Sequence, residues 1–158
     1  MVTDANIWID LVNAGLARQV FELGEPLITP DFVLEELRGD ADELLGFGLE
    51  IVSLDGSQIE ELRELVGNYV RCSTPDLASL VVAREKRLIL LTGDGALRDA
   101  AEELCVEVHG VLWVLDRLVG TELIAQSEAR VGLERIIAEG AFLPPIEVQR
   151  RLVRWGRE

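Results

Sequence analysis

The chain has 158 residues, of which 49% are hydrophobic and 28% are charged, and its net charge is −14. This composition excludes a disordered chain, and the length fits one domain with a buried core. No apolar run reaches the roughly 20 residues of a membrane-spanning helix. No basic segment precedes an apolar stretch near the N-terminus, as in a secretory signal. We therefore expect a cytoplasmic protein with no membrane partner.

Histidine and cysteine are too few for a histidine-based zinc site or a Ser-His-Asp triad. His109 is the only histidine, and Cys72 and Cys105 have no metal-ligand spacing. Both cysteines stand among apolar neighbours, which predicts buried free thiols. Any catalysis is therefore expected to depend on carboxylates.

Short strands and helices alternate through the first 110 residues. The strand 88–91 is the most hydrophobic, which favours a place inside the sheet with both faces covered. The helix 77–84 is apolar nearly all round, which predicts a buried helix. After a very short strand that ends before Asp4, the other expected strands are 27–28, 51–54 and 106–108, and the other expected helices are 8–13, 16–21, 57–69 and 96–104.

Two helices are expected to begin with the same kind of sequence. In Thr29-Pro30-Asp31 we expect Thr29 to be the N-cap, Pro30 the first helical residue and Asp31 an acid in the positive first turn. Ser73-Thr74-Pro75-Asp76 repeats this pattern and places Asp76 second in its helix.

Strands that alternate with helices predict a three-layer α/β/α sandwich with a central parallel sheet. From residue 110 the pattern changes to helices only, expected at 111–119, 122–138 and 145–155. No linker separates the two parts. We therefore expect an α/β core of residues 1–110 and a C-terminal helical extension of residues 111–158, packed on the same domain.

Three aspartates stand where a parallel sheet places its ligand sites. Asp4 follows the first strand and Asp94 ends the most hydrophobic one, and open α/β sheets bind ligands at this edge. Asp76 begins a helix that is otherwise apolar. Each has a structural alternative, since Asp4 and Asp94 are good helix caps and Asp76 stabilises a helix dipole. Asp31 stands in the same context as Asp76 and shows how readily such an aspartate occurs.

A glutamate is expected to join them from the helix after Pro30. With about 100° per residue counted from Phe32, Val33 lies at about 100° and Glu36 at about 40°, whereas Glu35 lies at about 300°. Glu36 is therefore expected on the apolar side, where a carboxylate needs a partner or a metal, and Glu35 in solvent.

Four carboxylates close together cannot all ionise without a cation. Oxygen ligands suit Mg²⁺ or Mn²⁺, and one or two such ions can acidify a water and hold phosphate oxygens. This is the chemistry of phosphodiester hydrolysis.

Five short segments of the chain, which follow one another in the same order as in the family, resemble the PIN domain (PilT N-terminus) family. These ribonucleases include the VapC-like toxins of type II toxin–antitoxin pairs. The resemblance implies that Asp4, Glu36, Asp76 and Asp94 are the catalytic metal-binding acids, supported by Asn6 and Thr92. Asp99 is either a further acid or a helix-surface residue. The pieces that carry the resemblance are residues 2–10, Thr29-Pro30, 33–37, 75–78 and 90–94.

The family resemblance implies a Mg²⁺- or Mn²⁺-dependent endoribonuclease that acts on RNA, with an antitoxin partner if it is a toxin, and a homodimer. Residues 110–115 and 140–144 also resemble a less studied PIN subgroup with additional C-terminal helices. Membership of that subgroup weakens the inference that the protein is a toxin.

The acidic composition conflicts with RNA binding, which normally needs a basic surface. Arg98, one turn after Asp94, is a candidate phosphate contact. The last ten residues add Arg150, Arg151, Arg154 and Arg157 against Glu158. This cluster is either a solvated basic helix end or a contact for the substrate or an antitoxin.

Two other functions compete with the ribonuclease. Gly93-Asp94-Gly95, Asp99 and Lys86 echo a haloacid-dehalogenase-like phosphatase, but that family needs a second aspartate where this chain has Asn6. An amide cannot act as the general acid. The third interpretation is a non-catalytic PIN-fold module that binds partners.

Overall fold

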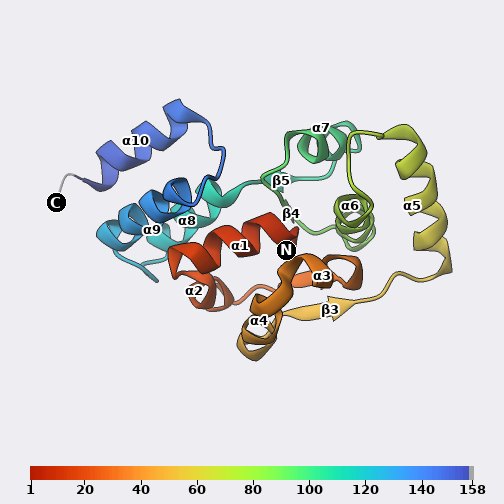
Figure 1. Ribbon diagram of the computed structural model, residues 1–158, viewed down its shortest axis with the longest axis horizontal. Coiled ribbons are helices and arrows are strands. Elements are labelled where there is room, and N and C mark those ends of the chain that lie inside the picture. Colours follow the sequence, from red (N-terminus) through yellow and green to blue (C-terminus); the bar gives the residue numbers. More distant parts are fainter. Residues whose placement is uncertain (157–158) are drawn as a thin grey trace.

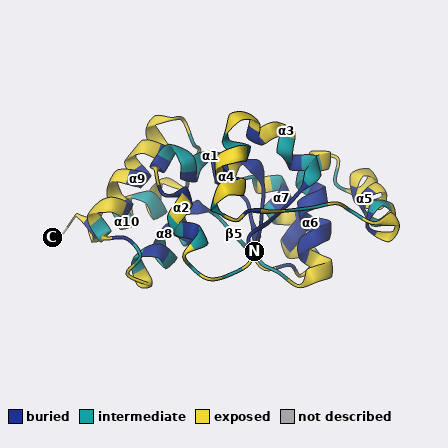
Figure 2. Cartoon of the chain, turned by 90° about the horizontal axis from the view of Figure 1, so that it is seen from below, coloured by how far each residue is buried: buried dark blue, intermediate teal, exposed yellow. Residues whose placement is uncertain are grey.

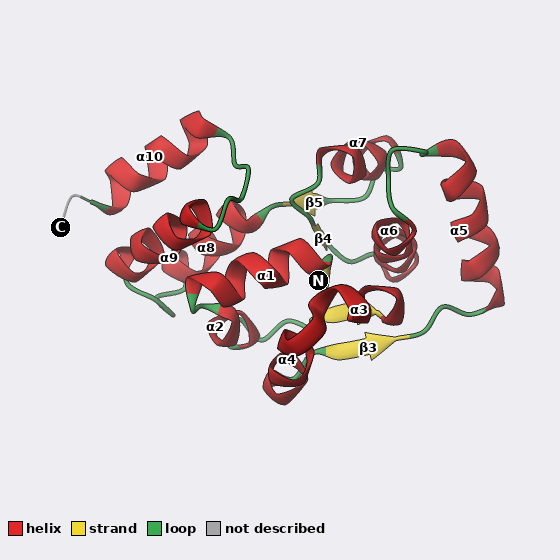
Figure 3. Cartoon of the chain, in the orientation of Figure 1, coloured by secondary structure: helices red, strands yellow, loops and turns green. Residues whose placement is uncertain are grey.

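The computed structural model describes residues 1–156, and its centre is a five-stranded parallel sheet. The strands occur in the order β3-β2-β1-β4-β5, and Figure 3 shows how short they are beside the helices. The order runs outward from β1 to β3 and then returns to β4 on the other side of β1. Strands β1 and β4 therefore flank the switch point of the topology, where open sheets bind ligands. The strands are β1 (Val2–Thr3), β2 (Ile28–Pro30), β3 (Glu50–Val52), β4 (Leu90–Leu91) and β5 (Val108–His109).

Helices cover both faces of the sheet, which confirms the predicted three-layer α/β/α sandwich. In Figure 1, α5, α6 and α7 lie on one side, and α1, α2, α8 and α9 lie on the other. Two 3₁₀ turns occur at Asp31–Val33 and Arg38–Asp40. The helices are α1 (Ala5–Ala14), α2 (Ala17–Phe21), α3 (Leu34–Leu37), α4 (Ala41–Phe47), α5 (Gly56–Asn68), α6 (Thr74–Lys86), α7 (Gly95–Glu103), α8 (Val111–Gly120), α9 (Gln126–Ala138) and α10 (Pro145–Trp155).

The strands divide their side chains between two buried clusters, as the two-residue repeat of a strand requires. Leu90 packs with α6 and α7, whereas its neighbour Leu91 packs with α1 and α8. Residues 77–83 of α6 are all buried, which confirms the prediction of a buried helix. Figure 2 shows the deepest burial at the sheet and α6, with exposed residues along the outer helices. The interior position predicted for β4 is also confirmed, although the strand contains only Leu90 and Leu91.

The helix start predicted at Thr29 is wrong. Thr29 lies in β2, where its hydroxyl is 2.9 Å from that of Thr3 and accepts a hydrogen bond from Trp8 Nε1 at 3.2 Å. These buried partners occupy the hydroxyl, so no side chain caps the 3₁₀ turn that follows. The second predicted start is shifted by one residue, because Ser73 is the N-cap of α6 and Asp76 is its third residue.

Other helix boundaries differ from the predicted ones where the local sequence pattern was weak. Helix α1 begins directly at Ala5 rather than at Trp8, and Gly15 ends it with φ of 73°, as expected for a glycine. Helix α9 begins at Gln126 rather than at residue 122. Helix α4 was not predicted, and its one fully buried residue, Leu44, explains why its sequence shows no clear apolar stripe.

The two helices α8 and α9 belong to the same buried cluster as α1. Helix α9 approaches the end of α1 closely at Gly132, where an added Cβ would lie 2.7 Å from Leu16 Cδ1. Trp155 of α10 is 2% exposed and joins this cluster. The division into a core of residues 1–110 and an extension of residues 111–158 stays a prediction.

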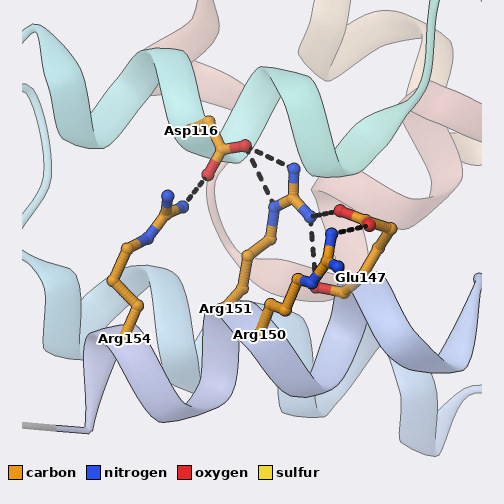
Figure 4. Close-up of polar contacts among 5 residues, drawn as sticks. All are labelled: Asp116, Glu147, Arg150, Arg151 and Arg154. Atoms are coloured by element: carbon orange, nitrogen blue, oxygen red, sulfur yellow. Dashed lines mark hydrogen bonds and ion pairs between the residues drawn. The ribbon is translucent and has the colours of Figure 1, made fainter.

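Helix α10 is held on α8 by a network of ion pairs (Figure 4). Asp116 of α8 accepts hydrogen bonds from Arg151 Nε at 3.0 Å and Nη2 at 2.5 Å, and another from Arg154. Glu147 pairs with Arg150 and Arg151. Acids of the chain therefore pair with these three arginines. Arg150 and Arg154 are exposed, as expected of a solvated basic helix end, whereas Arg151 is largely buried in its ion pairs. Arg157 and Glu158 lie outside the described residues.

The cysteines are free, as predicted, but the prediction that they are buried is wrong. Cys72 is half-buried, and Cys105 is exposed at the turn after α7. Within residues 1–156, no helix combines the length and the apolar character that a membrane crossing requires.

Candidate functional site

The carboxyl ends of β1 and β4 bring Asp4 and Asp94 to the switch point of the sheet. Thr92 lies between them: its hydroxyl donates to Asp4 Oδ2 at 2.5 Å and accepts from the backbone N–H of Asp94 at 3.0 Å. The backbone N–H of Asp4 donates to the carbonyl of Leu91 at 3.1 Å. The two strand ends are therefore fixed to each other through Thr92.

Asp4 is both a helix cap and a buried charge. Its Oδ1 accepts the backbone N–H of Ile7 at 3.0 Å, so it caps α1 as its structural alternative predicts. Only 1% of the residue is exposed, and this burial raises the pKa of its carboxyl to about 6. Hydrogen bonds from Thr92 and Ile7 oppose the shift, and the charge of Asp76 adds to it. Because a cap works as well at the surface, capping alone does not account for an aspartate this deeply buried.

Asp76 is the carboxylate that links the others electrostatically. It lies in the first turn of α6, and its partial burial raises its pKa. A hydrogen bond with Ser73 opposes this shift, while the negative charges of Asp94 and Glu36 increase it. Asp76 also raises the pKa of Asp4. The other three acids that were predicted as ligands, Asp4, Asp94 and Glu36, therefore lie within electrostatic range of Asp76.

Asp94 caps α7 in the same way that Asp4 caps α1. Its Oδ2 accepts the backbone N–H of Leu97 at 2.8 Å. Its other oxygen has no such helix contact, and the residue lines a cavity. Asp94 is therefore a helix cap, as its structural alternative predicts, and the cap uses only one of its two carboxylate oxygens. The other oxygen is left for other ligands.

Glu36 does not lie on the apolar side of its helix as predicted, because it is exposed. The prediction assumed one regular helix from Phe32, but a 3₁₀ turn with about 120° per residue comes first and α3 is a single turn. Glu35 is exposed as predicted, and both glutamates line a groove shared with Asp76. The charge of Glu36 acts on Asp76, which favours Glu36 of the two.

Two hollows meet at Asn6, which is exposed at the start of α1. The first has a volume of about 810 Å³ and contains Glu36 and Asp76 in its wall. The second has a volume of about 1090 Å³ and is lined by Asp94 and by residues of the C-terminal helices. Asn6 lines both hollows, with the buried Asp4 two residues before it. Asn6, Glu36, Asp76 and Asp94 therefore line two hollows that share Asn6, and Asp4 is buried behind them.

Arg98 lies in the second hollow, and Asp99 lies outside both. The guanidinium of Arg98 donates to the carbonyl of Thr92 at 3.3 Å and passes over Gly110, where an added Cβ would lie 3.2 Å from Nη2. The absence of a side chain at Gly110 leaves room for this arginine. Asp99 is exposed and pairs with Arg71 at 3.4 Å, as its surface alternative predicts.

Asp10 is a residue of the site that the sequence did not indicate. It lies one turn after Asn6 on the same face of α1 and lines the second hollow. Burial raises its pKa to about 6, and no cation or donor among the described residues offsets that cost. The four-residue spacing from Asn6 was the available signal.

The donor set is chemically suited to a hard cation. The four acids offer only oxygen atoms, which Mg²⁺ and Mn²⁺ prefer, and the carboxylates repel one another. In the described part of the chain, residues 1–156, no three acids, histidines or cysteines have side chains close enough together to hold one ion. Three of these acids can share an ion only if their side chains rotate toward one another.

The features shared with the phosphatase do not converge. Lys86 is the last residue of α6, whereas Asp76 is in its first turn. Ten residues of helix separate the two by about 15 Å, toward the opposite edge of the sheet. Lys86 therefore lies away from Asp4 and Asp94.

A comparison with protein families gives a match over residues 1–157 to the model DUF3368, described as a PIN domain. In comparisons with curated proteins and with solved structures, nothing matches the chain.

Proposed function

Because the chain belongs to the PIN-domain family, we propose that it is a Mg²⁺- or Mn²⁺-dependent endoribonuclease that hydrolyses RNA phosphodiester bonds. PIN domains are generally nucleases and typically use divalent metals. The observation that carries the proposal is the electrostatic coupling of Asp4, Asp76, Asp94 and Glu36 at the switch point of the sheet. Such a group of acids is stabilised by a cation and destabilised without one.

In this proposal, Asp4, Asp76, Asp94 and Glu36 hold one or two ions. A divalent ion supplies charge neutralisation on the phosphate and acidifies a water. Thr92 orients the carboxylate of Asp4 through its hydroxyl and the loop of Asp94 through its backbone. Asn6 offers an uncharged amide between the two hollows, and Arg98 offers a cation to a phosphate in the second one.

The test compares Asp76→Asn with Asp31→Asn as a matched control. Both aspartates follow a Thr-Pro pair, but Asp31 accepts a hydrogen bond from Ser53 and lies outside the hollows. With Mn²⁺ and a fluorescent RNA, we expect Asp76→Asn and Asp94→Asn to lose at least about 100-fold in cleavage rate. Asp31→Asn is expected to cleave at the rate of the unchanged protein.

The same samples distinguish the other functions. Mn²⁺ should raise the melting temperature of the unchanged protein and of Asp31→Asn, but not that of Asp76→Asn. If RNA cleavage and this response to Mn²⁺ survive both site substitutions, the metal site is wrong. Rapid hydrolysis of an aryl phosphate would favour the phosphatase, and Mn²⁺-independent RNA binding without cleavage would favour the non-catalytic module.

The toxin role, the antitoxin partner, the homodimer and the cytoplasmic location stay predictions. Light scattering tests the homodimer. Growth arrest on expression, relieved by a protein encoded beside it, tests the toxin role.

A further inference from the structure

We propose that the second hollow is a pocket for a guanine base, in which Asp10 selects the base and Phe142 stacks on it. The inference rests on the proposed function for its meaning, because the pocket adjoins Asp94 and would place one base of an RNA beside the cleaved bond. Its chemistry is independent of metal and of cleavage.

The first observation is a carboxylate without a partner inside a cavity. Asp10 is half-buried in a hollow of about 1090 Å³, a volume that accommodates a nucleotide. Burial is what raises its pKa, and no hydrogen bond or ion pair within residues 1–156 offsets it. A surface carboxylate has water as its partner, but a half-buried one is stabilised by a ligand that donates hydrogen bonds.

The second observation is an aromatic ring that the fold does not use. Phe142 is 95% exposed, although it lines the same hollow, at the segment that joins α9 to α10. Its neighbours Ala141 and Leu143 pack on the core. An exposed aromatic ring at the mouth of a cavity provides a surface on which a base can stack.

Two further rings of the lining are aromatic, and contacts within the chain fix them in place. Trp113 stacks on His109 with ring centroids 4.2 Å apart, and the guanidinium of Arg117 lies 5.1 Å from the centre of the Trp113 ring. Both rings line the hollow. The ion pairs of Arg151 with Asp116 and Glu147 hold α10, and with it the segment that carries Phe142 (Figure 4).

A carboxylate distinguishes guanine from the other three bases. Guanine presents two parallel donors, N1–H and N2–H, which match the two oxygens of one carboxylate. Adenine and cytosine each place an acceptor beside their amino group, and uracil places a carbonyl on either side of its one N–H. Each of these acceptors would repel an ionised Asp10. A bidentate pair of this kind therefore selects the matching base over the others.

The experiment measures binding in the presence of a chelator, where no metal-dependent cleavage occurs. The probes are fluorescent hexauridines that carry one central guanosine, adenosine or cytidine, together with the unmodified hexauridine. We expect the guanosine probe to bind about 10- to 100-fold more tightly than the others. Asp10→Asn should lose this preference and gain affinity for adenosine or cytidine, because an amide offers the donor and acceptor that their edges need.

Two further variants keep the test decisive. Asp42→Asn makes the same chemical change on exposed α4, outside both hollows, and should behave as the unchanged protein. Phe142→Ala should weaken all four probes about tenfold, because stacking does not depend on the base. Its exposure means that folding does not depend on the ring.

Equal affinity for the four probes, or a guanosine preference that survives Asp10→Asn, overturns the inference. If RNA is cleaved with Mn²⁺ and these results hold, the proposed function stands and the pocket does not. If the guanosine preference depends on Asp10 but no cleavage occurs, the pocket stands and the nuclease proposal fails.

Discussion

Two partly or fully buried aspartates in this chain have opposite surroundings. Asp116 on α8 accepts hydrogen bonds from the guanidinium groups of Arg151 and Arg154 (Figure 4). Asp4 is more deeply buried, yet among the described residues its hydrogen bonds come from a backbone N–H and a hydroxyl, and the nearby charge is another carboxylate. A buried acid whose charge the chain balances is structural, whereas one left unbalanced points to a cation from outside.

Removing the charge of Asp116 should have the largest effect on stability. Asp116→Asn leaves Arg151, whose side chain is 15% exposed, without its main counter-charge. We expect the free energy of unfolding to fall by about 2–3 kcal/mol, below the full cost of breaking a buried pair because water reaches Asp116. Urea denaturation measures it, and a loss under about 0.5 kcal/mol would mean that the network does not hold α10.

The same substitution at Asp4 should have the opposite sign. Asparagine caps a helix as well as aspartate does and can still bond with Thr92, but it carries no buried charge. In chelator at pH 8, we expect Asp4→Asn to raise the free energy of unfolding by about 2 kcal/mol. This is less than the roughly 3 kcal/mol to which the pKa shift from 3.8 to about 6 corresponds, because burying the amide also has a cost. A decrease like that at Asp116 would show that the charge of Asp4 is balanced within the chain.

The pH dependence of the free energy of unfolding also tests whether the charge of Asp4 is unbalanced in the folded chain. The pKa of Asp4 is about 6 in the folded chain against an ordinary value of 3.8, so between these values the folded state binds more protons. The stabilisation from the neutral form is therefore complete below the lower value and lost as the pH rises through 6. From pH 8 to pH 5, the unchanged protein should gain about 1.4 kcal/mol relative to Asp4→Asn. A constant gap between the two curves would contradict the raised pKa.

The smallest effect is expected at the edge of the α10 network. Arg150 pairs with Glu147 at 2.8 Å, but its side chain is 72% exposed. Arg150→Gln should change the free energy of unfolding by no more than about 0.5 kcal/mol, since water screens exposed pairs. A loss as large as that of Asp116→Asn would show that the network acts as one unit.

Features that depend on adjacent residues could be predicted from the sequence. Asp4 directly follows the short strand β1 and Asp94 comes three residues after the last residue of β4, and both lie at the edge of the sheet where that pattern placed them. Glu36 was misplaced because a 3₁₀ turn interrupts the regular helix that the prediction assumed, and Thr29 was misplaced because a distant part of the chain binds its hydroxyl. The Thr29 hydroxyl is bound to Thr3, 26 residues away, rather than to the turn that follows.

Asp10 shows the same limit in the site itself. It reads as an ordinary polar residue on an amphipathic helix, and a helical wheel places it beside Asn6. The hollow it lines is closed by residues 141–144, far along the chain, and by α10. Its burial is therefore a tertiary property that no local pattern in residues 1–14 contains.

The position of β1 between β2 and β4 also determines when the site can form during synthesis. Asp4 leaves the ribosome early, but its bond to Thr92 spans 88 residues, and Asp94 follows later still. Contacts this distant in sequence form only after a large loop has closed. The nascent chain therefore carries no complete set of acids until β4 has paired with β1. If the chain is the nuclease proposed above, its site forms only after these strands have left the translating ribosome.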